Sequence, residues 1–445
     1  MTKDLTTGSV TKTMLIFACP MILGNLLQQL YNVADSFIVG KFIGSDALAA
    51  VGSAYSLMTF ITSVLIGLCM GSGTIFSVCF GKGDREKLKN SAAASFIGAV
   101  TVIINIIVFA AVDPILHILN VPDDVYAMMR SYVVIVFGGL IFVFLYNYFA
   151  FLLRAIGNSA VPLYFLGAAA VINIVLDVVL VTAADMGISG AAVATVIAQA
   201  VSGVGLGAYV LIKEPELLPK KSELHITSAL VKEVTRHSFA ASIQQSVMNF
   251  GILMIQGLVN SFGTAVMAAF AAAVKIDSFA YMPAQEFGNA FSIFISQNHG
   301  GGKHDRVKEG MRRAAVASAA FCLFVSVLIF VLAKYLMQIF IDPSETEIIG
   351  IGIGYLRIEG SFYIGIGVLF LLYGFYRGIE KPEMSLVLTI ISLGTRVLLA
   401  YVLSPVPAIG VVGIWSAIPI GWFLADAVGI LYMKRALGKV QNKNG

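Results

Sequence analysis

The sequence predicts an all-α polytopic membrane protein with about twelve transmembrane helices in two six-helix parallel repeats. Three observations lead to this prediction. Of the 445 residues, 58% are hydrophobic and only 12% are charged, whereas soluble domains carry about 25% charged residues. Basic residues gather in alternate loops, as they do in membrane proteins of defined orientation. The chain also repeats itself once, with a period of about 220 residues.

Apolar runs of about 20 residues or more recur along the whole chain, and the mean hydropathy is +0.89. Each run is long enough to cross the hydrocarbon core as a helix. The predicted spans are 13–40, 47–80, 91–112, 126–153, 161–183 and 187–212 in the first half, and 237–260, 264–299, 311–340, 349–377, 384–404 and 409–433 in the second. The polar start MTKDLTTGSVTK is not typical of a removable signal peptide, so none is expected.

The distribution of basic residues predicts the orientation of the chain. Most of the 29 lysines and arginines fall in the loops after the second and eighth spans, in the central linker and in the C-terminal tail, with Lys87 and Arg306 as examples. We also assign Arg377, at the end of a span, to this side. The opposite loops collect acids such as Asp113 and Asp342. A multi-pass protein of the inner or plasma membrane with both termini in the cytoplasm is therefore expected.

The two halves of the chain match each other at several motifs. The matches are Gln28 and Gln29 with Gln244 and Gln245, GKGDR at 81–85 with GKHDR at 302–306, Arg154 with Arg377, and Gly187 with Gly410. Each half holds an even number of spans, so both have the same topology, as in transporters built from parallel repeats that rock about a central cavity. We predict an N-terminal lobe at 1–212, a cytoplasmic linker at 213–236 and a C-terminal lobe at 237–445.

The first predicted span carries a carboxylate, Asp35, well inside an apolar run. Asn32, Gln28 and Asn25 precede it at helical spacing, so the four polar side chains share one face of the helix. An ionisable side chain in the middle of a membrane costs about 2.5–3.5 kcal/mol even on the lenient insertion scale, so it normally faces a cavity or a partner. This face is therefore expected to look into the protein.

Further polar residues of the first half join Asp35 in a predicted cation site. Asn173 and Asp177 are four residues apart on one span, Thr195 lies on the next, and Asn147 is nearby on an earlier one. Carboxylate, amide and hydroxyl oxygens suit a sodium ion, and a carboxyl pair also suits a proton. The alternative is a structural hydrogen-bond network between helices. Two aspartates inside spans of one lobe favour function.

The second half differs at the equivalent positions. With an offset of 223 residues, Asn173 falls on Arg396 and Asp177 on Ala400, so we expect the acidic cluster, and the ion site, in the N-terminal lobe alone. Charged residues inside the later spans are Lys275, Asp277, Glu286, Arg357, Glu359 and Arg396. A substrate cavity is predicted from Asn32, Gln28, Gln245, Asn249, Glu286, Asn289 and Arg396. The alternative for Glu286 is an internal salt bridge with Arg357, Arg396 or Lys275.

No motif in the chain indicates an enzyme. The sequence contains no GxxxxGK[ST], HExxH or GxSxG, so we expect no catalytic residues, no nucleotide hydrolysis and no cofactor other than a sodium ion. The basic loops are interpreted as determinants of topology, so no nucleic-acid partner is expected. The expected partners are the lipid bilayer, small organic substrates and the coupling ion, which is a proton or sodium, and the chain is expected to be a monomer.

The chain resembles the multidrug and toxic compound extrusion (MATE) family over nearly its full length. The resemblance rests on Pro20 and Met21, VADSFIVGKFIG around Asp35, GKGDREK after the second span, RAIGN from Arg154, NIVLD from Asn173 and SQNHGGGKHDR after the eighth span. It implies a MATE-like fold and a polyspecific exporter that exchanges organic, often cationic, amphipathic compounds for sodium ions or protons. By motif match, the family's cation site corresponds here to Asp35, Asn173, Asp177 and Thr195, with Asn147 nearby.

Two other functions stay open at this point. The basic groups Lys275 and Arg396 in the second half are unusual beside a cavity for cations, and they would suit a zwitterionic or anionic substrate. A flippase of the same superfamily that moves a lipid or lipid-linked oligosaccharide is therefore the alternative, although about twelve spans rather than fourteen count against it. A receptor or structural membrane protein is disfavoured, because we expect buried charge in only one copy of the repeat.

Overall fold

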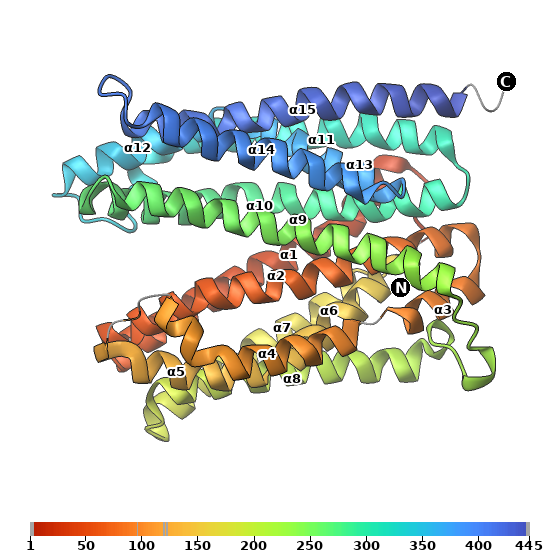
Figure 1. Cartoon of the computed structure of the whole chain (residues 1–445), viewed down its shortest axis with the longest axis horizontal. Coiled ribbons are helices and arrows are strands. Elements are labelled where there is room, and N and C mark those ends of the chain that lie inside the picture. The colour runs from red at the N-terminus through yellow and green to blue at the C-terminus, as the bar shows by residue number, and fades with distance from the viewer. Residues whose placement is uncertain (1–3, 96, 119–120, 122, 442–445) are drawn as a thin grey trace. The chain divides into compact units, whose positions relative to one another are not determined.

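The computed structural model describes residues 4–95, 97–118, 121 and 123–441, and almost all of them are helical (Figure 1). The helices are α1 Val10–Phe42, α2 Ser45–Lys82, α3 Arg85–Ala94, α4 Ile97–Ile118, α5 Asp123–Gly138, α6 Leu140–Ala155, α7 Ala160–Val178, α8 Gly187–Lys213, α9 Ser228–Asn260, α10 Thr264–Gly300, α11 His304–Met337, α12 Thr346–Gly360, α13 Tyr363–Gly378, α14 Pro382–Leu403 and α15 Val411–Gln441. The all-α prediction is confirmed.

The number of membrane-spanning helices is close to the prediction. Within the described residues, nine helices are long and apolar enough to cross a membrane, and two bent pairs raise the number to eleven. The pair α5 and α6 bends by 43°, and the pair α12 and α13 bends by 51°. The predicted span 237–260 lies in α9, which is helical but is not among the apolar spans, because glutamines and asparagines such as Gln244, Gln245 and Asn249 recur along it.

The chain divides into two compact units. The first contains residues 19–242 with the N-terminal residues up to Leu5, and the second contains Thr6–Ala18 and residues 243–445. The boundaries fall inside α1 and α9, so each of these helices begins in one unit and ends in the other. The lobes and linker predicted from the sequence, divided at 212 and 237, stay a prediction.

The start of α9 packs very closely on α2 within the first unit. An added Cβ at Gly71 would lie 2.2 Å from the backbone oxygen of His237, and one at Gly67 would lie 2.4 Å from Cα of Ser242. The hydroxyl oxygens of Ser72 and Ser238 are 2.8 Å apart. Glycine is required on this face of α2 because the two backbones leave no room for a side chain. The beginning of α9 is therefore part of the first unit.

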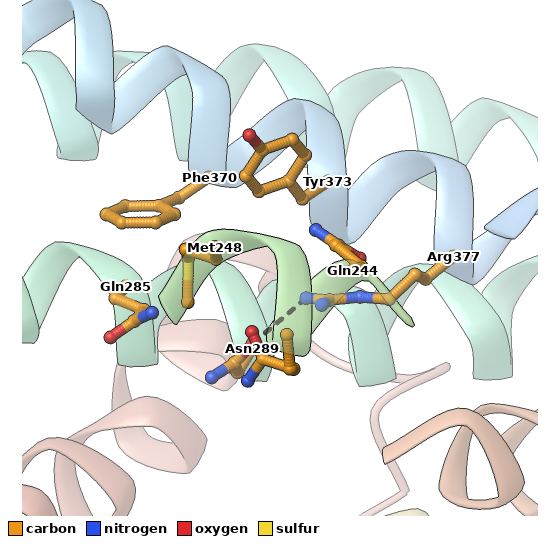
Figure 2. Close-up of a pocket in the computed structure, with 8 residues that line it drawn as sticks. Gln244, Met248, Gln285, Asn289, Phe370, Tyr373 and Arg377 are labelled. Atoms are coloured by element: carbon orange, nitrogen blue, oxygen red, sulfur yellow. Dashed lines mark hydrogen bonds between the residues drawn. The ribbon is translucent and has the colours of Figure 1, made fainter. Parts of the chain in front are cut away.

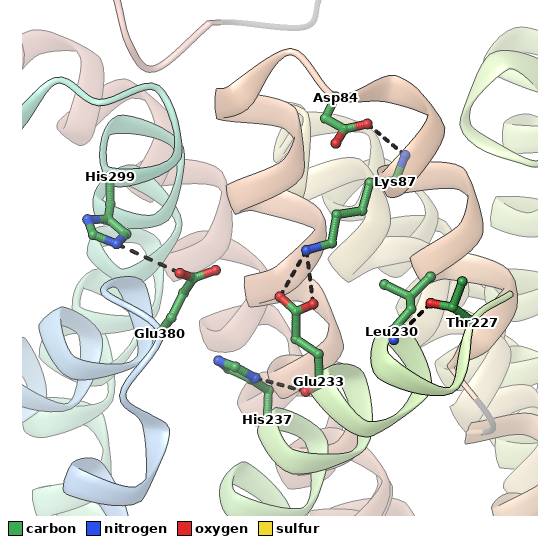
Figure 3. A network of polar contacts seen from close by, with 8 residues as sticks. All are labelled: Asp84, Lys87, Thr227, Leu230, Glu233, His237, His299 and Glu380. Atoms are coloured by element: carbon green, nitrogen blue, oxygen red, sulfur yellow. Dashed lines mark hydrogen bonds and ion pairs between the residues drawn. The ribbon is translucent and has the colours of Figure 1, made fainter. Parts of the chain in front are cut away.

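Polar contacts fix the chain just before and at the start of α9. Lys87 on α3 forms an ion pair with Glu233 on α9 at 2.9 Å, and Asp84 caps α3 by accepting a hydrogen bond from the backbone N–H of Lys87 (Figure 3). Lys89 bonds Glu223 of the linker at 2.9 Å. These residues belong to the GKGDREK motif and its continuation, so the motif anchors the linker in the first unit.

The matching motif of the second half plays a similar part in the second unit. Lys303 donates hydrogen bonds to the backbone and hydroxyl oxygens of Thr6 at 2.9 and 2.8 Å. Arg306 donates to the backbone oxygens of Thr7 and Gly8. Each basic loop therefore holds the segment that leads into α9 or α1. This shared role supports the internal repeat.

Candidate functional site

Two buried aspartates meet inside the first unit. Asp35 on α1 is 7% exposed and Asp177 on α7 is fully buried. Their carboxyl groups are close enough to hydrogen-bond each other when one of them carries a proton. Without that proton, Asp35 Oδ1 and both carboxylate oxygens of Asp177 have no hydrogen-bond partner in the described part of the chain. The pair therefore has unused capacity for a proton or a cation.

Other oxygen atoms of the first unit surround the pair. Asn173 lies one turn before Asp177 on α7, is 1% exposed, and has no described hydrogen-bond partner for either side-chain atom. The buried Thr195 on α8 lies beside Tyr132 on α5, and Tyr132 and Tyr31 lie near both carboxylates. The structure therefore brings together the predicted residues of α1, α7 and α8.

The backbone is irregular directly after this site. Helix α7 ends at Val178, and the chain continues as a π-helical turn at Val179–Ala183 before α8. Short π-helical turns are frequent at functional sites because they re-aim side chains along a helix. The turn begins two residues after Asp177, so the irregular backbone adjoins this carboxyl group.

The donor set fits a proton or a sodium ion. Asp35 and Asp177 supply carboxylate oxygens, Asn173 an amide oxygen and Thr195 a hydroxyl, and hard cations prefer such ligands. The described residues hold no group of three or more His, Cys, Asp or Glu that would suit a transition metal. A proton shared by the two carboxyl groups would remove half of the buried negative charge.

The other candidates of the first unit lie outside this group of contacts. Asn147 on α6 donates its amide to the backbone oxygen of Val143 in its own helix at 2.8 Å. On α1, Asn32 is half-buried and Gln28 is exposed. Their assignment to an ion site or a substrate cavity stays a prediction. Sequence reasoning missed Tyr31 and Tyr132, because tyrosine is common in apolar spans and carries no spacing signal.

A small polar pocket lies within the second unit. It measures about 10 Å³, which is room for one water-sized group, and Figure 2 shows most of its walls. The lining residues are Gln244, Gln245, Met248, Gln285, Asn289, Phe370, Tyr373 and Arg377. Four amide side chains, a guanidinium and two aromatic rings therefore face one space. Of the predicted cavity residues, Gln245 and Asn289 line it.

Arg377 dominates the polarity of the pocket. This side chain is 4% exposed and donates a hydrogen bond from Nη2 to Asn289 Oδ1 at 2.9 Å, and Asn289 Nδ2 donates to Glu286 Oε1 at 3.2 Å. The guanidinium and the carboxylate are thus linked through an amide. Sequence analysis used Arg377, at the end of a span, only as an indicator of the cytoplasmic side, and so missed its place in the pocket.

Several charged residues of the second half lie elsewhere than the sequence indicated. Glu286 accepts a hydrogen bond from Asn289 and lies near Arg377, which was not among the partners considered from the sequence, namely Arg357, Arg396 and Lys275. Lys275 and Arg357 are exposed and lie over the rings of Phe340 and Phe330. Asn249 donates to the backbone oxygen of Gln245 at 3.1 Å.

Arg396 is not among the residues that line the pocket. It lies near Asp277 and Glu359, which are 3% and 4% exposed. The expectation that buried acids cluster in only one half of the chain is therefore corrected. The comparison of equivalent positions failed because only Arg396, on α14, matches a residue of the first site. The two acids, Asp277 on α10 and Glu359 on α12, have no acidic equivalent in the first half.

Comparisons with known proteins identify relatives over most of the chain. The sequence model of the MatE family matches residues 20–179 and 239–402. The probable multidrug resistance protein YpnP of Bacillus subtilis is 32% identical over 399 residues, which cover 87% of each chain. The probable multidrug resistance protein NorM of Thermotoga maritima is 25% identical and covers 91% of this chain and 88% of its own.

Solved structures share the fold. A transporter of the MOP superfamily from Pyrococcus furiosus, described as having a binding pocket of reverse polarity, superimposes with a TM-score of 0.92 at 23% identity over 98% of both chains. A multidrug resistance MATE transporter in an outward-facing conformation gives the same TM-score, identity and coverage. At this identity the likeness establishes the fold alone.

Proposed function

Because the chain belongs to the MatE family, we propose that it is a secondary antiporter that exports organic, amphipathic and mainly cationic compounds in exchange for protons or sodium ions. Its relatives in Bacillus subtilis and Thermotoga maritima are named as multidrug resistance proteins. The match covers 87% and 88% of the lengths of these two relatives.

The observation that carries this proposal is the buried pair Asp35 and Asp177. Two carboxylates with unpartnered oxygens in membrane-spanning helices are costly unless a proton or cation joins them. Binding of the ion would change the charge between α1 and α7, and release would restore it. A ligand can shift a conformational balance only through different affinities for the two states. The ion would act in this way on the packing of α1, α5, α7 and α8.

Dye efflux from proteoliposomes tests the proposal. The purified protein would be reconstituted with a cationic fluorescent compound, and a sodium gradient and a proton gradient would be imposed separately. The proposal expects one of the two gradients to drive uphill movement of the dye. Protein-free vesicles with the same gradients serve as the control. Absence of movement under both gradients would contradict it.

A second substrate class is favoured by Arg377. Its guanidinium is buried in a pocket with amide and aromatic walls, which suits the carboxylate of a zwitterionic or anionic organic compound. A relative at 22% identity, from Shewanella oneidensis, is named as an FAD transporter. Competition of dye efflux by such compounds would support this class. Movement of a labelled anionic lipid between leaflets, without dye efflux, would instead support a flippase.

A further inference from the structure

The second unit holds a charge centre of its own, made of the buried Asp277 on α10, the buried Glu359 on α12 and the half-buried Arg396 on α14. The two acids are 3% and 4% exposed. Helix α10 packs against both α12 and α13. From α13, the hydroxyl of Tyr363 donates a hydrogen bond to Asp277 Oδ1 at 2.5 Å. This second-unit charge centre shares no residue with the Asp35 and Asp177 pair.

Titratable tyrosines face the centre from three of the helices around it. Tyr281 comes from α10, Tyr355 from α12 and Tyr363 from α13. Lys275 and Arg357 belong to the same helices, but their side chains are exposed and lie over aromatic rings. With both acids ionised, two negative charges therefore face the single positive charge of Arg396, which leaves a net charge of minus one.

One oxygen of the centre is free to accept a proton. Glu359 Oε2 is buried and has no hydrogen-bond partner in the described part of the chain, and the same holds for Arg396 Nε. Besides Arg396, Glu359 lies near the Tyr355 hydroxyl. An unpartnered buried carboxylate oxygen is costly, and a proton removes that cost by neutralising the group.

The centre occupies the same place in the second half as the aspartate pair does in the first. Arg396 is equivalent to Asn173 at the offset of 223 residues, and Tyr355 is equivalent to Tyr132 at the same offset. In each half the tyrosine lies beside the buried acids. The second half differs in having a guanidinium where the first has an amide. A guanidinium has only N–H donors, so it cannot coordinate a metal cation as an amide oxygen can, whereas a proton needs only one carboxylate oxygen.

We propose that the second-unit charge centre is a proton-binding site that takes one proton on the Asp277 and Glu359 pair, at Glu359 Oε2, and excludes sodium through Arg396. In this step a free proton adds to the carboxylate oxygen to give a carboxylic acid. The net charge of the centre changes from minus one to zero, and no other bond forms or breaks. The site is independent of the proposed coupling role of Asp35 and Asp177 and adds a second titrating group to the chain.

The chain contains its own reporter for this site. It has two tryptophans, Trp415 and Trp422, and both lie in the second unit. Trp415 is 1% exposed, and its ring is perpendicular to that of Tyr355 with centroids 5.0 Å apart. In a Trp422→Phe background all tryptophan emission comes from Trp415. The experiment follows this emission in full-length protein in lipid nanodiscs between about pH 5 and about pH 9.

The proposal expects a single pH-dependent change in emission that is the same with and without sodium. Glu359→Gln should abolish it, Glu359→Asp should retain it, and Asp35→Asn should leave it unchanged because that residue belongs to the other unit. Arg396→Asn, which introduces the residue found at the equivalent position of the first half, should make the emission sensitive to sodium.

Three results would overturn the proposal. They are a wild-type emission that does not respond to pH, a response that survives unchanged in Glu359→Gln, and a wild-type response that depends on sodium. If Glu359→Gln does not fold, Tyr363→Phe decides. Loss of its hydrogen bond to Asp277 should move the midpoint to higher pH, because that bond stabilises the ionised carboxylate, and an unmoved midpoint contradicts the assignment. Loss of dye efflux in Asp35→Asn with an intact emission change would separate this site from the proposed coupling site.

Discussion

Lys87 Nζ lies 2.9 Å from Glu233 Oε2, and this ion pair joins α3 to the first turns of α9. The pair closes a contact between residues that are far apart in the chain but belong to one unit. Together with the hydrogen bonds from Lys303 and Arg306 to residues 6–8, it shows that both basic loops hold a segment leading into a helix shared by the two units. The basic loops that orient the chain thus also have a structural role.

Reversing the charges of this ion pair should test its contribution. Both side chains are about one-third exposed, so solvent screening limits the pair to roughly 0–1 kcal/mol. Glu233→Lys should lower the thermal midpoint slightly, and Lys87→Glu together with Glu233→Lys should restore it. Scanning fluorimetry at low and high salt measures this. A double variant no more stable than the single one would contradict the pairing.

The linker contact of Glu223 should depend on pH. A hydrogen bond from Lys89 and one from the Lys220 backbone hold the pKa of Glu223 below its ordinary value. Because the folded-state pKa is lowered, the stabilisation is present above the ordinary carboxylate pKa of about 4.3 and is lost as the pH falls through the lowered value. Hydrogen exchange of the linker should therefore be faster in Glu223→Gln than in wild type at neutral pH. The two should converge in acid, and a difference that persisted there would contradict this.

Gly71 should tolerate no side chain. A Cβ at this position of α2 would lie 2.2 Å from the His237 backbone oxygen, whereas one at Gly52 of the same helix would meet nothing within 4 Å. Gly71→Ala should destabilise the protein by about 1–3 kcal/mol through overpacking. Gly52→Ala should be neutral or stabilise by about 0.5–1 kcal/mol, because alanine favours helix. Equal thermal midpoints for the two variants would show that α2 and α9 do not pack as closely as described.

Arg377 should select substrates by charge. Arg377→Gln removes the buried positive charge but keeps hydrogen-bonding capacity toward Asn289. Loss of one partner of a buried charge pair costs about 2–5 kcal/mol, so the KM for zwitterionic or anionic compounds should rise at least tenfold while cationic dyes are little affected. Arg357→Gln, at an exposed position, is the control. A uniform loss for all substrates would indicate a structural role instead.

Much of the fold follows from apolar run length. The runs predict most helices to within a few residues, and the helical spacing of Asn173 and Asp177 predicts their shared face. The bends do not follow. The break between α5 and α6 falls at Gly139 inside a continuous apolar segment, and the break between α12 and α13 falls at Ser361 and Phe362 inside a run predicted as one span. A hydropathy average over about 20 residues does not resolve a turn of one or two residues.

The second-unit charge centre could not be predicted for a different reason. Asp277, Glu359 and Arg396 lie on three helices, so no spacing in the chain links them. Each alone resembles a residue near the end of a span, where a long side chain reaches the interface at little cost. Only the packing of α10 against α12 and α13 shows that the acids are buried together. The role of Arg377 was missed because span-end arginines usually indicate orientation.

The measurement that tests the central claim most directly is ion-driven dye efflux by Asp35→Asn, Asp177→Asn and Asp113→Asn in proteoliposomes. Asp113 is the control, because its exposed carboxylate pairs with Arg130 at 2.6 Å, away from the buried pair. We predict that the first two variants insert normally but lose gradient-driven efflux, while Asp113→Asn retains it. Efflux at the wild-type rate in both Asp35→Asn and Asp177→Asn would contradict the account.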